Sequence, residues 1–216
     1  MELWSLWTHL IEQALAYLST HLGLSDAVSI IVLTVIARAL LMPVSLTAAY
    51  RMHKNKVALE RIKPRIEQLR SAHKDNPSEL ANRTMALYRE HGITFMDRVS
   101  LLNVGSQSAF GIGIYQVLRR LPFSSPFLWI SNLAKPDLLL TLLVGVLMAV
   151  GFALMPGTIT ETSNLLLLAV PILVSVIAIA ALPSTLGVYW ATSNVVTITQ
   201  ALLLRGVLAR QARFAA

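Results

Sequence analysis

Five long apolar stretches alternate with polar segments along the chain. They cover residues 27–49, 99–118, 138–155, 165–182 and 185–204. A helix needs about 20 apolar residues to cross the roughly 30 Å of hydrocarbon in a bilayer, so each stretch is predicted to be a transmembrane helix. The third and fourth have only about 18 residues and require a locally thinned bilayer or extended helix ends.

The first 24 residues have the pattern of an amphipathic helix. The apolar positions on one face are Leu3, Trp4, Trp7, Leu10, Ile11, Ala14, Leu15 and Leu18. The polar positions opposite are Ser5, His9, Glu12 and Gln13. Because the segment has no Lys or Arg, it differs from a secretory signal, and we expect it to lie in the membrane interface with its tryptophans at headgroup level. Packing against the helix bundle is the alternative, and the pattern does not separate the two.

The largest polar segment, residues 50–98, is predicted to form a helical hairpin. Apolar residues recur along both arms, so that the arms can pack on each other: Leu59, Ile62, Ile66 and Leu69 in the first, and Leu80, Leu87 and Tyr88 in the second. The turn reads DNPSE, in which Asn76 can cap a helix, Pro77 suits its first position and Glu79 can reach back as in a capping box. Gly92 is predicted to end the second arm.

The composition fits a membrane protein. Hydrophobic residues make up 55% of the 216 residues and charged residues 13%, and the mean hydropathy of +0.63 exceeds what a soluble domain of this length needs. There is no cysteine, which excludes disulfides, thiolate chemistry and a lipid-modified cysteine. The predicted fold class is an all-α membrane protein with five transmembrane helices, an N-terminal interfacial helix and a cytoplasmic helical hairpin. The predicted parts are an interfacial helix (1–24), a first transmembrane helix (25–49), the hairpin (50–98), transmembrane helices two to five (99–205) and a short basic tail (206–216).

The distribution of positive charge predicts how the chain crosses the membrane. The hairpin carries eleven Lys/Arg against six Asp/Glu, and three more arginines lie near the C-terminus. These fourteen basic residues fall on one side of a five-span arrangement, three lie in the loop 119–137 on the other side, and Arg38 lies inside. Because cytoplasmic loops carry the excess of Lys and Arg, the hairpin and C-terminus are predicted to be cytoplasmic and the N-terminus outside. The length of the hairpin favours a macromolecular partner over a mere topology signal.

Arg38 lies near the middle of the first apolar stretch, within TVIARALLMPVS (residues 34–45). None of the five stretches contains an Asp or Glu that could neutralise it. An unpaired charge that faces lipid at this depth costs at least about 3 kcal/mol, so the guanidinium is expected to face water or polar groups.

Polar side chains in two other stretches suggest where Arg38 points. Asn103 and Gln107 are four residues apart in the second stretch. In the last stretch, an arc of about 120° on a helix holds Trp190, Ser193, Asn194, Thr197 and Gln200. One such residue is more often an interhelical hydrogen-bonding group. The whole set, together with Arg38, predicts a wet, positively charged cavity between the first, second and fifth transmembrane helices. Three small residues of the second stretch, Gly105, Ala109 and Gly113, form a separate face suited to close helix packing.

The ordered set of motifs resembles the YidC/Oxa/Alb family of membrane protein insertases over most of the chain. The motifs are IARALLMPVSL, IKPRIEQL, LYREHG, Gln107 followed by Tyr115, and LPSTLGVYWATSNVVTITQ. The resemblance implies a five-helix core with a hydrophilic groove that is open to cytoplasm and lipid but closed toward the outside. It places Arg38, Gln107 and Trp190 at groove positions, with the arginine attracting acidic parts of a client protein. Ala109 departs from the family pattern, which has a proline there.

The resemblance further implies an insertase and chaperone of the bacterial plasma membrane whose partners are client membrane proteins and the lipid bilayer. The ribosome, the Sec translocon or a targeting factor are further candidate partners. No DNA, small-molecule substrate, cofactor or metal is expected. A small transporter or anion channel that uses the intramembrane arginine is the alternative, although the chain shows no internal repeat or pair of interrupted helices. An enzyme is not expected, because the five histidines all lie outside the predicted spans and no span offers a catalytic pair.

Overall fold

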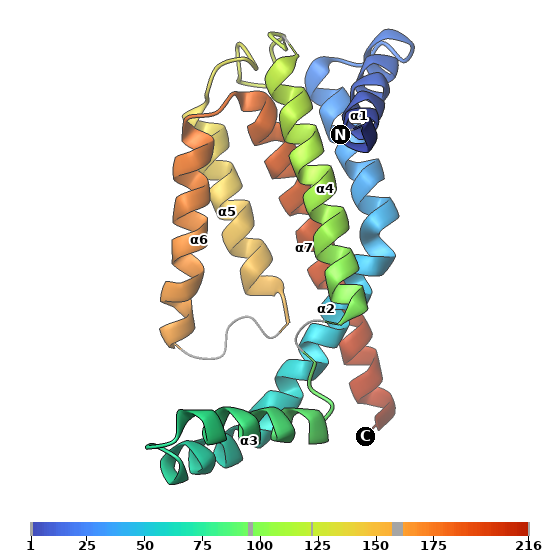
Figure 1. Cartoon of the computed structure of the whole chain (residues 1–216). Helices are drawn as coiled ribbons and strands as arrows, with labels where there is room; N and C mark the ends of the chain where they lie inside the picture. The colour runs from blue at the N-terminus through green and yellow to red at the C-terminus, as the bar shows by residue number, and fades with distance from the viewer. Residues whose placement is uncertain (1, 95–96, 122, 157–161, 216) are drawn as a thin grey trace. The chain divides into compact units, whose positions relative to one another are not determined.

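The computed structural model describes residues 2–94, 97–121, 123–156 and 162–215, and its regular elements there are all helices (Figure 1). In chain order these are α1 Glu2–Thr20, α2 Asp26–Ala72, α3 Pro77–Glu90, α4 Arg98–Arg120, α5 Leu138–Leu154, α6 Thr162–Ala180 and α7 Ser184–Ala215. They form two compact units, one of Met1–Pro43 with Val104–Ala216 and the other of Val44–Asn103. The all-α prediction is confirmed.

Two helices run beyond the predicted boundaries. α2 has 47 residues and continues from the apolar stretch through the first arm of the hairpin, so the predicted boundary at 49 is a change of composition and not of backbone structure. α7 has 32 residues and takes in most of the predicted tail 206–216, because the single glycine there does not end a helix rich in Ala, Leu and Arg. Among the described residues, α2 alone is long and apolar enough to cross a membrane, while Leu138–Leu154 and Ala169–Ala180 are apolar but shorter.

The core of the first unit lies at one end of its helices. Its buried side chains come from the first half of α2, the second half of α4 and the start of α7, and from α1, α5 and the segment 123–137: they are Ile11, Leu15, Ala27, Ile30, Phe110, Ile114, Val117, Leu118, Ile130, Leu133, Leu140, Leu186 and Val188. Close van der Waals packing of these side chains stabilises the unit, because lipid around a membrane bundle is as apolar as the side chains themselves.

The segment 123–137 is tied to this core by hydrogen bonds rather than by regular structure. The Ser125 hydroxyl donates to Asp26 Oδ2 at the start of α2 (2.7 Å). The hydroxyl and amide of Ser184, at the start of α7, both donate to the Lys135 carbonyl, at 2.6 and 3.0 Å. The sequence predicted only a loop here, because contacts between residues so far apart leave no local pattern.

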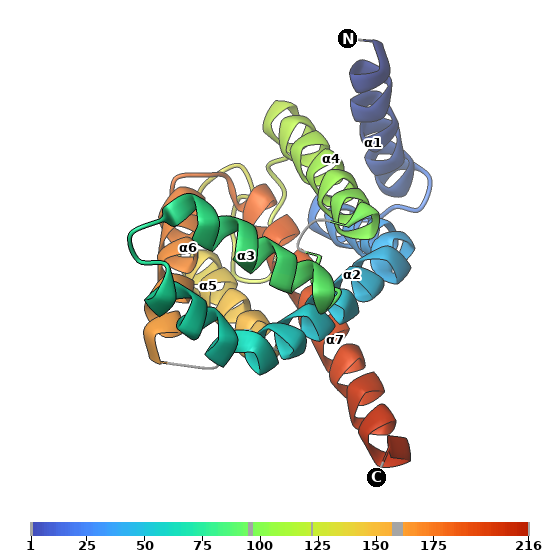
Figure 2. The same ribbon diagram turned by 60° about the horizontal axis from the view of Figure 1, so that its bottom comes forward.

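α5 packs against both α6 and α7, and Figure 1 and Figure 2 both show it beside α6. A glycine allows α5 and α6 to approach closely, since a Cβ on Gly145 of α5 would lie 2.8 Å from Val176 Cγ2 of α6. The Arg205 guanidinium of α7 donates to the carbonyls of Ala153 (3.0 Å) and Leu154 (2.5 Å) at the end of α5. A cation at this position also favours the negative end of the helix dipole.

The N-terminal helix α1 packs on α4 through its tryptophans. The Trp7 indole N–H donates to the Ala109 carbonyl and that of Trp4 donates to Gln116 Oε1, both at 2.9 Å. A Cβ on Gly113 would lie only 2.7 Å from Trp7 Nε1. The alternative that α1 packs on the bundle is therefore confirmed, and so is the close-packing role of Gly113, while Ala109 contributes its backbone carbonyl to the contact.

Part of the predicted apolar face of α1 stays uncovered. Ile11, Leu15 and Leu18 are buried, whereas Leu3 and Leu10 are exposed. Gly105, the third member of the predicted small-residue face, has no atom within 4 Å of an added Cβ and so makes no close packing contact. A location of α1 in the membrane interface stays a prediction.

The second unit is the predicted hairpin, whose arms α3 and the second half of α2 lie side by side in Figure 1 and Figure 2. Its core holds Ile62, Leu87 and Ile93, with Ala58, Leu59, Ile66, Leu69 and Tyr88 packed around them. Most of the predicted contact residues are confirmed. Leu80 is not part of this cluster, and Ile93 was missed because it lies beyond the end of the second arm.

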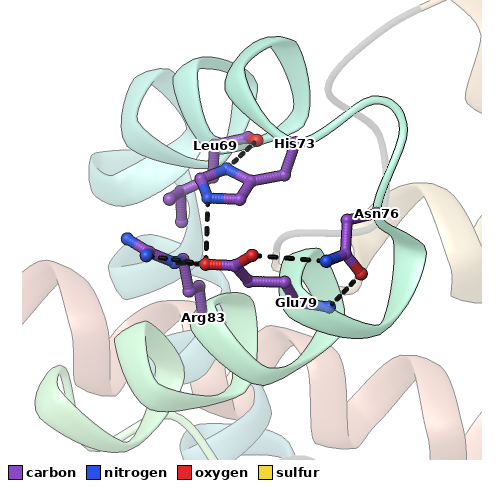
Figure 3. Close-up of polar contacts among 5 residues, drawn as sticks. All are labelled: Leu69, His73, Asn76, Glu79 and Arg83. Atoms are coloured by element: carbon purple, nitrogen blue, oxygen red, sulfur yellow. Dashed lines mark hydrogen bonds and ion pairs between the residues drawn. The ribbon is translucent and has the colours of Figure 1, made fainter.

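Figure 3 shows the polar network at the hairpin turn. Asn76 Oδ1 accepts from the Glu79 amide (3.2 Å), which confirms the predicted cap. The Glu79 carboxylate accepts from the Asn76 side chain (3.3 Å) and from Arg83 Nε and Nη2 (2.9 and 2.7 Å), not from the Asn76 backbone as a capping box would have it. His73 Nε2 lies 3.5 Å from the same carboxylate, while its Nδ1 donates to the Leu69 carbonyl. The hydrogen bonds from Arg83 lower the pKa of Glu79.

Gly92 ends α3 as predicted. Its φ of +65° is a left-handed conformation that a residue with a side chain adopts at a cost of about 1–2 kcal/mol. The Gly92 amide donates to the Arg89 carbonyl (3.1 Å) and the Ile93 amide to the Tyr88 carbonyl (2.9 Å). This pair of bonds is a Schellman motif, with the buried Ile93 as its accompanying apolar contact.

An ion pair joins the two ends of the hairpin. Arg51 of α2 bonds to Asp97 Oδ2, and Asp97 Oδ1 caps α4 by accepting from the Ser100 amide (2.7 Å). The hydrogen bond from Arg51 and those from Ser100 lower the pKa of Asp97 from its usual 3.8 to about 2. A second contact beside it is the Asn55 side-chain amide, which donates to the Thr94 carbonyl (2.6 Å).

Asp97→Asn is expected to loosen the base of the hairpin at neutral pH. Asparagine retains the cap on α4 but loses the ion pair. Because the folded pKa is depressed, the stabilisation is complete well above pH 3.8 and disappears as the pH falls toward 2. Hydrogen exchange of the hairpin amides, corrected for its intrinsic pH dependence, should therefore be faster in the variant at pH 6 and converge with the parent near pH 2. Asp75→Asn, at the turn, is the matched control, and a difference that persists unchanged at pH 2 would contradict the assignment.

Candidate functional site

The Arg38 side chain is held by groups from two other helices. Nη1 donates to Gln107 Oε1 of α4. Nη2 donates to Thr197 Oγ1 (2.6 Å) and to the Ser193 carbonyl (3.3 Å), both on α7. The structure therefore brings α2, α4 and α7 together at the arginine, as the sequence predicted for the first, second and last apolar stretches.

These acceptors set the electrostatics of the site. Gln107, Thr197 and Ser193 offer an amide, a hydroxyl and a carbonyl, all neutral, so the positive charge of Arg38 is solvated by dipoles and not cancelled. Arg38 is also only partly buried. A solvated but uncompensated cation keeps a long-range attraction for anionic groups that a salt-bridged arginine would lose.

The remaining predicted site residues do not all join Arg38. Asn194 donates to the Trp190 carbonyl one turn back on its own helix (2.8 Å). Gln200 is 6% exposed and therefore buried in the bundle. Trp190 is partly buried and lies one turn from Ser193 and Asn194. Asn103 belongs to the second compact unit, and its part in the site stays a prediction.

A cavity of about 270 Å³ lies farther along α4 and α7, toward the end of the unit that carries segment 123–137. It is lined by Gly111, Ile112, Tyr115, Leu186, Tyr189 and Trp190. Four of these belong to the motifs recognised in the sequence: Tyr115, Leu186, Tyr189 and Trp190. The lining is largely aliphatic and aromatic, so this space suits an apolar side chain or acyl chain better than a charged group.

Tyr189 was quoted as part of the last sequence motif but was not predicted as a site residue. Its hydroxyl is 3.3 Å from where a Cβ on Gly111 would lie, and its ring packs edge-on against Phe110 with centroids 6.2 Å apart. A glycine directly opposite an aromatic residue was the available signal, but only the three-dimensional alignment of α4 and α7 shows that the two positions face each other. Ser193 was predicted through its hydroxyl, whereas Arg38 bonds to its carbonyl.

Buried apolar residues separate the Arg38 site from the 123–137 end of the unit. Along α2 the buried Ile30 lies two helical turns before Arg38; along α4, Phe110 and Ile114 follow Gln107. At about 1.5 Å per residue, the eight-residue step from Ile30 to Arg38 corresponds to about 12 Å along the helix. A layer of buried apolar residues therefore lies between Arg38 and the 123–137 end of the unit.

The residues described by the structure include no group of three or more His, Asp or Glu positioned to hold a metal ion. The site thus consists of hydrogen-bonding groups and one cation, which can bind and orient a polar segment.

The chain matches a protein-family model described as "60Kd inner membrane protein" over residues 17–211. This match covers all of α2 to α6 and most of α7, including every residue that contacts Arg38.

Relatives from several bacteria share the name membrane protein insertase YidC. The membrane protein insertase YidC of Helicobacter pylori (strain ATCC 700392 / 26695) is 30% identical over 190 residues, which are 86% of this chain but 34% of the relative. That of Clostridium tetani (strain Massachusetts / E88) is 26% identical over 202 residues, 91% of this chain and 89% of the relative. That of Fusobacterium nucleatum subsp. nucleatum is 28% identical over 200 residues, 89% of this chain and 93% of the relative. The chain thus spans about a third of the Helicobacter relative and about nine tenths of the other two.

Proposed function

The chain belongs to the 60Kd inner membrane protein family, and from that membership we propose that it is a membrane protein insertase and chaperone of a bacterial membrane. It would receive the polar segment of a client protein in a positively charged groove around Arg38 and release the client's apolar segment into the bilayer. Client membrane proteins and lipid are its partners, and the ribosome, the Sec translocon or a targeting factor are candidate partners for delivery.

The proposed topology has five spans, built from the first part of α2, α4, α5, α6 and the first part of α7. The N-terminus lies outside, and the hairpin and C-terminus lie in the cytoplasm, following the positive charges. α1 lies in the outer interface while packed on α4. Its exposed Leu3 and Leu10 fit this position, because they can enter the acyl boundary without losing the tryptophan contacts.

The carrying observation is that, among the residues that the structure describes, Arg38 donates to neutral acceptors on α4 and α7. A client's polar segment would need several kcal/mol to enter hydrocarbon unaided, because its polar groups would lose their hydration. In the proposed groove, the amide, hydroxyl and guanidinium groups replace part of that hydration, and an acidic client segment gains attraction to Arg38. The layer of buried apolar residues between Arg38 and the 123–137 end supports closure of the groove toward the outside. Burial of the client's own apolar surface drives its release into lipid, so no nucleotide is needed.

The experiment that tests the function is rescue in bacterial cells depleted of their own insertase. Expression of this chain should restore insertion of simple one-span and two-span clients, measured by protease protection of their translocated segments. Failure to rescue any client, with the chain present at normal level in the membrane, would contradict the proposal. Ion flux through liposomes that contain only this chain would instead support the transporter alternative.

Cysteines along α7 should distinguish a wet groove from a dry polar stripe. Replacements at Ser193, Asn194 and Thr197 are expected to react with a small polar maleimide added from the cytoplasmic side. Those at Val195 and Leu202, which are 50% and 53% exposed and face outward, should react slowly because lipid covers them. Equal protection of both sets would indicate a structural stripe.

Cysteines at the two ends of the predicted polar stripe, Trp190 and Gln200, are expected to react more slowly than those at its centre. Trp190 should react less than Ser193 because it lies nearer the closed outer end. Gln200 should react less than the sequence alone suggested, because its side chain is buried against the bundle.

A further inference from the structure

A polar cavity lies within the hairpin unit. Its volume is about 430 Å³, within the range of about 300–1,000 Å³ typical of small-ligand pockets. Its lining consists of Arg51, Lys54, Asn55, Ala58, His91, Gly92, Thr94 and Asp97. Two permanent cations and a histidine therefore line one space, which lies at the base of the hairpin beside the Arg51–Asp97 ion pair.

The carboxylate in the lining does not oppose an anion as strongly as its charge suggests. Asp97 Oδ2 is taken by Arg51, and Oδ1 by the Ser100 amide. The Asn55 amide is likewise used by the Thr94 carbonyl. Among the lining residues, Lys54, Arg51 and Thr94 have donor groups beyond these hydrogen bonds.

Lys54 brings a full positive charge to the lining. Its Nζ lies 6.0 Å from the centre of the Tyr50 ring, and among the contacts of the described residues it has no acidic partner. An ammonium with three donors beside a guanidinium is the arrangement that phosphate oxygens favour, because charged hydrogen bonds are about twice as strong as neutral ones. His91 uses Nδ1 to donate to the Leu87 carbonyl (3.0 Å), so its Nε2 remains for the cavity.

We propose that this cavity binds an anionic phosphate group, with Lys54 and Arg51 as its principal ligands. Phosphate binding goes beyond the insertase function and does not depend on it, whereas the choice of a lipid headgroup as the source rests on the proposed topology. Under the proposed topology the natural source of the phosphate is an anionic lipid headgroup. Arg51 is the first charged residue of α2 after Arg38, and Asp97 directly precedes α4, so this topology puts the cavity at the level of the cytoplasmic headgroups. A soluble phosphate compound has the same chemistry.

The test measures binding of lipid and of phosphate to the purified full chain in detergent. Native mass spectrometry gives the apparent affinity for one phosphatidylglycerol and for one phosphatidylcholine, and calorimetry tests inorganic phosphate. We expect Lys54→Gln to weaken phosphatidylglycerol binding about fivefold, which corresponds to about 1 kcal/mol for one basic residue. Lys54→Arg should restore it. Lys74→Gln, which removes the same charge at the far end of the hairpin, is the matched control and should leave binding unchanged.

The outcomes distinguish a lipid headgroup from a soluble phosphate compound as the ligand, and both from results that contradict the proposal. Binding of phosphatidylglycerol that depends on Lys54, without binding of inorganic phosphate, identifies a lipid headgroup site. Binding of inorganic phosphate that depends on Lys54 identifies a site for a soluble phosphate compound. Equal losses in Lys54→Gln and Lys74→Gln, or binding that is independent of Lys54, would overturn the proposal. Circular dichroism of each variant verifies the fold, and none of these results bears on client insertion.

Discussion

A chain from which residues 55–90 are deleted should no longer insert clients but should still accumulate in the membrane. The deleted segment belongs to a compact unit with its own apolar core around Ile62 and Leu87, and the core residues of the first unit all lie outside the deletion. It also takes away eight Lys/Arg and five Asp/Glu. If the hairpin contacts ribosomes, targeting factors or emerging clients through this surface, its loss removes an attraction that guides association.

The measurement combines two readouts in insertase-depleted cells: protein level in the membrane fraction and protease protection of a client. A short Gly/Ser linker should join residues 54 and 91, so that the Arg51–Asp97 ion pair can still form. A neutral helical hairpin of the same length is the control for spacing. Full activity of the deletion would remove the hairpin from the mechanism, and full activity of the neutral replacement would show that its charges are not needed.

Signals that act on the local backbone were readable from the sequence. Asn76 and Pro77 at the start of α3 and Gly92 at its end are found where the turn chemistry placed them, because capping involves only residues within one or two helical turns. The same locality explains the error at Glu79. Its carboxylate could reach several partners, and the side chain of Arg83 one turn later competes better than a backbone amide.

Contacts between distant segments were predictable only where polar residues recur on one face of a helix. The polar spacing along α4 and α7 anticipated that Gln107 and Thr197 would share a site with Arg38. Nothing periodic marks Tyr189, or the hydrogen bonds by which Ser125 and Lys135 tie the segment 123–137 to the helices, so those features needed the structure. The continuous α2 was missed for a related reason: hydropathy reports the surroundings of a segment, whereas backbone continuity depends on helix propensity.

Arg38→Ala should abolish insertion of clients with acidic translocated tails while leaving clients with neutral tails much less affected. The physical reason is the uncompensated charge, since an ion pair at 4 Å near a protein surface is worth about 4 kcal/mol. We therefore expect at least about a tenfold loss for an acidic client. Arg38→Lys should keep part of the function, because it retains the charge although it loses the planar fork that bonds to Gln107, Ser193 and Thr197 together.

The geometry also supplies a structural role that the same experiment must exclude. The guanidinium links α2 to α4 and to the Ser193 carbonyl of α7, so its loss could loosen the bundle. In that case Arg38→Ala would lower the amount of folded protein and impair both client types equally. Thr197→Val is the matched control, because it removes one acceptor of Arg38 with little change in volume and none in charge. It should reduce stability slightly and leave the difference between acidic and neutral clients intact. Normal protein levels in Arg38→Ala with equal insertion of both clients would exclude Arg38 as the attractor, and would leave the polar face of α7 as the part of the site still to be tested.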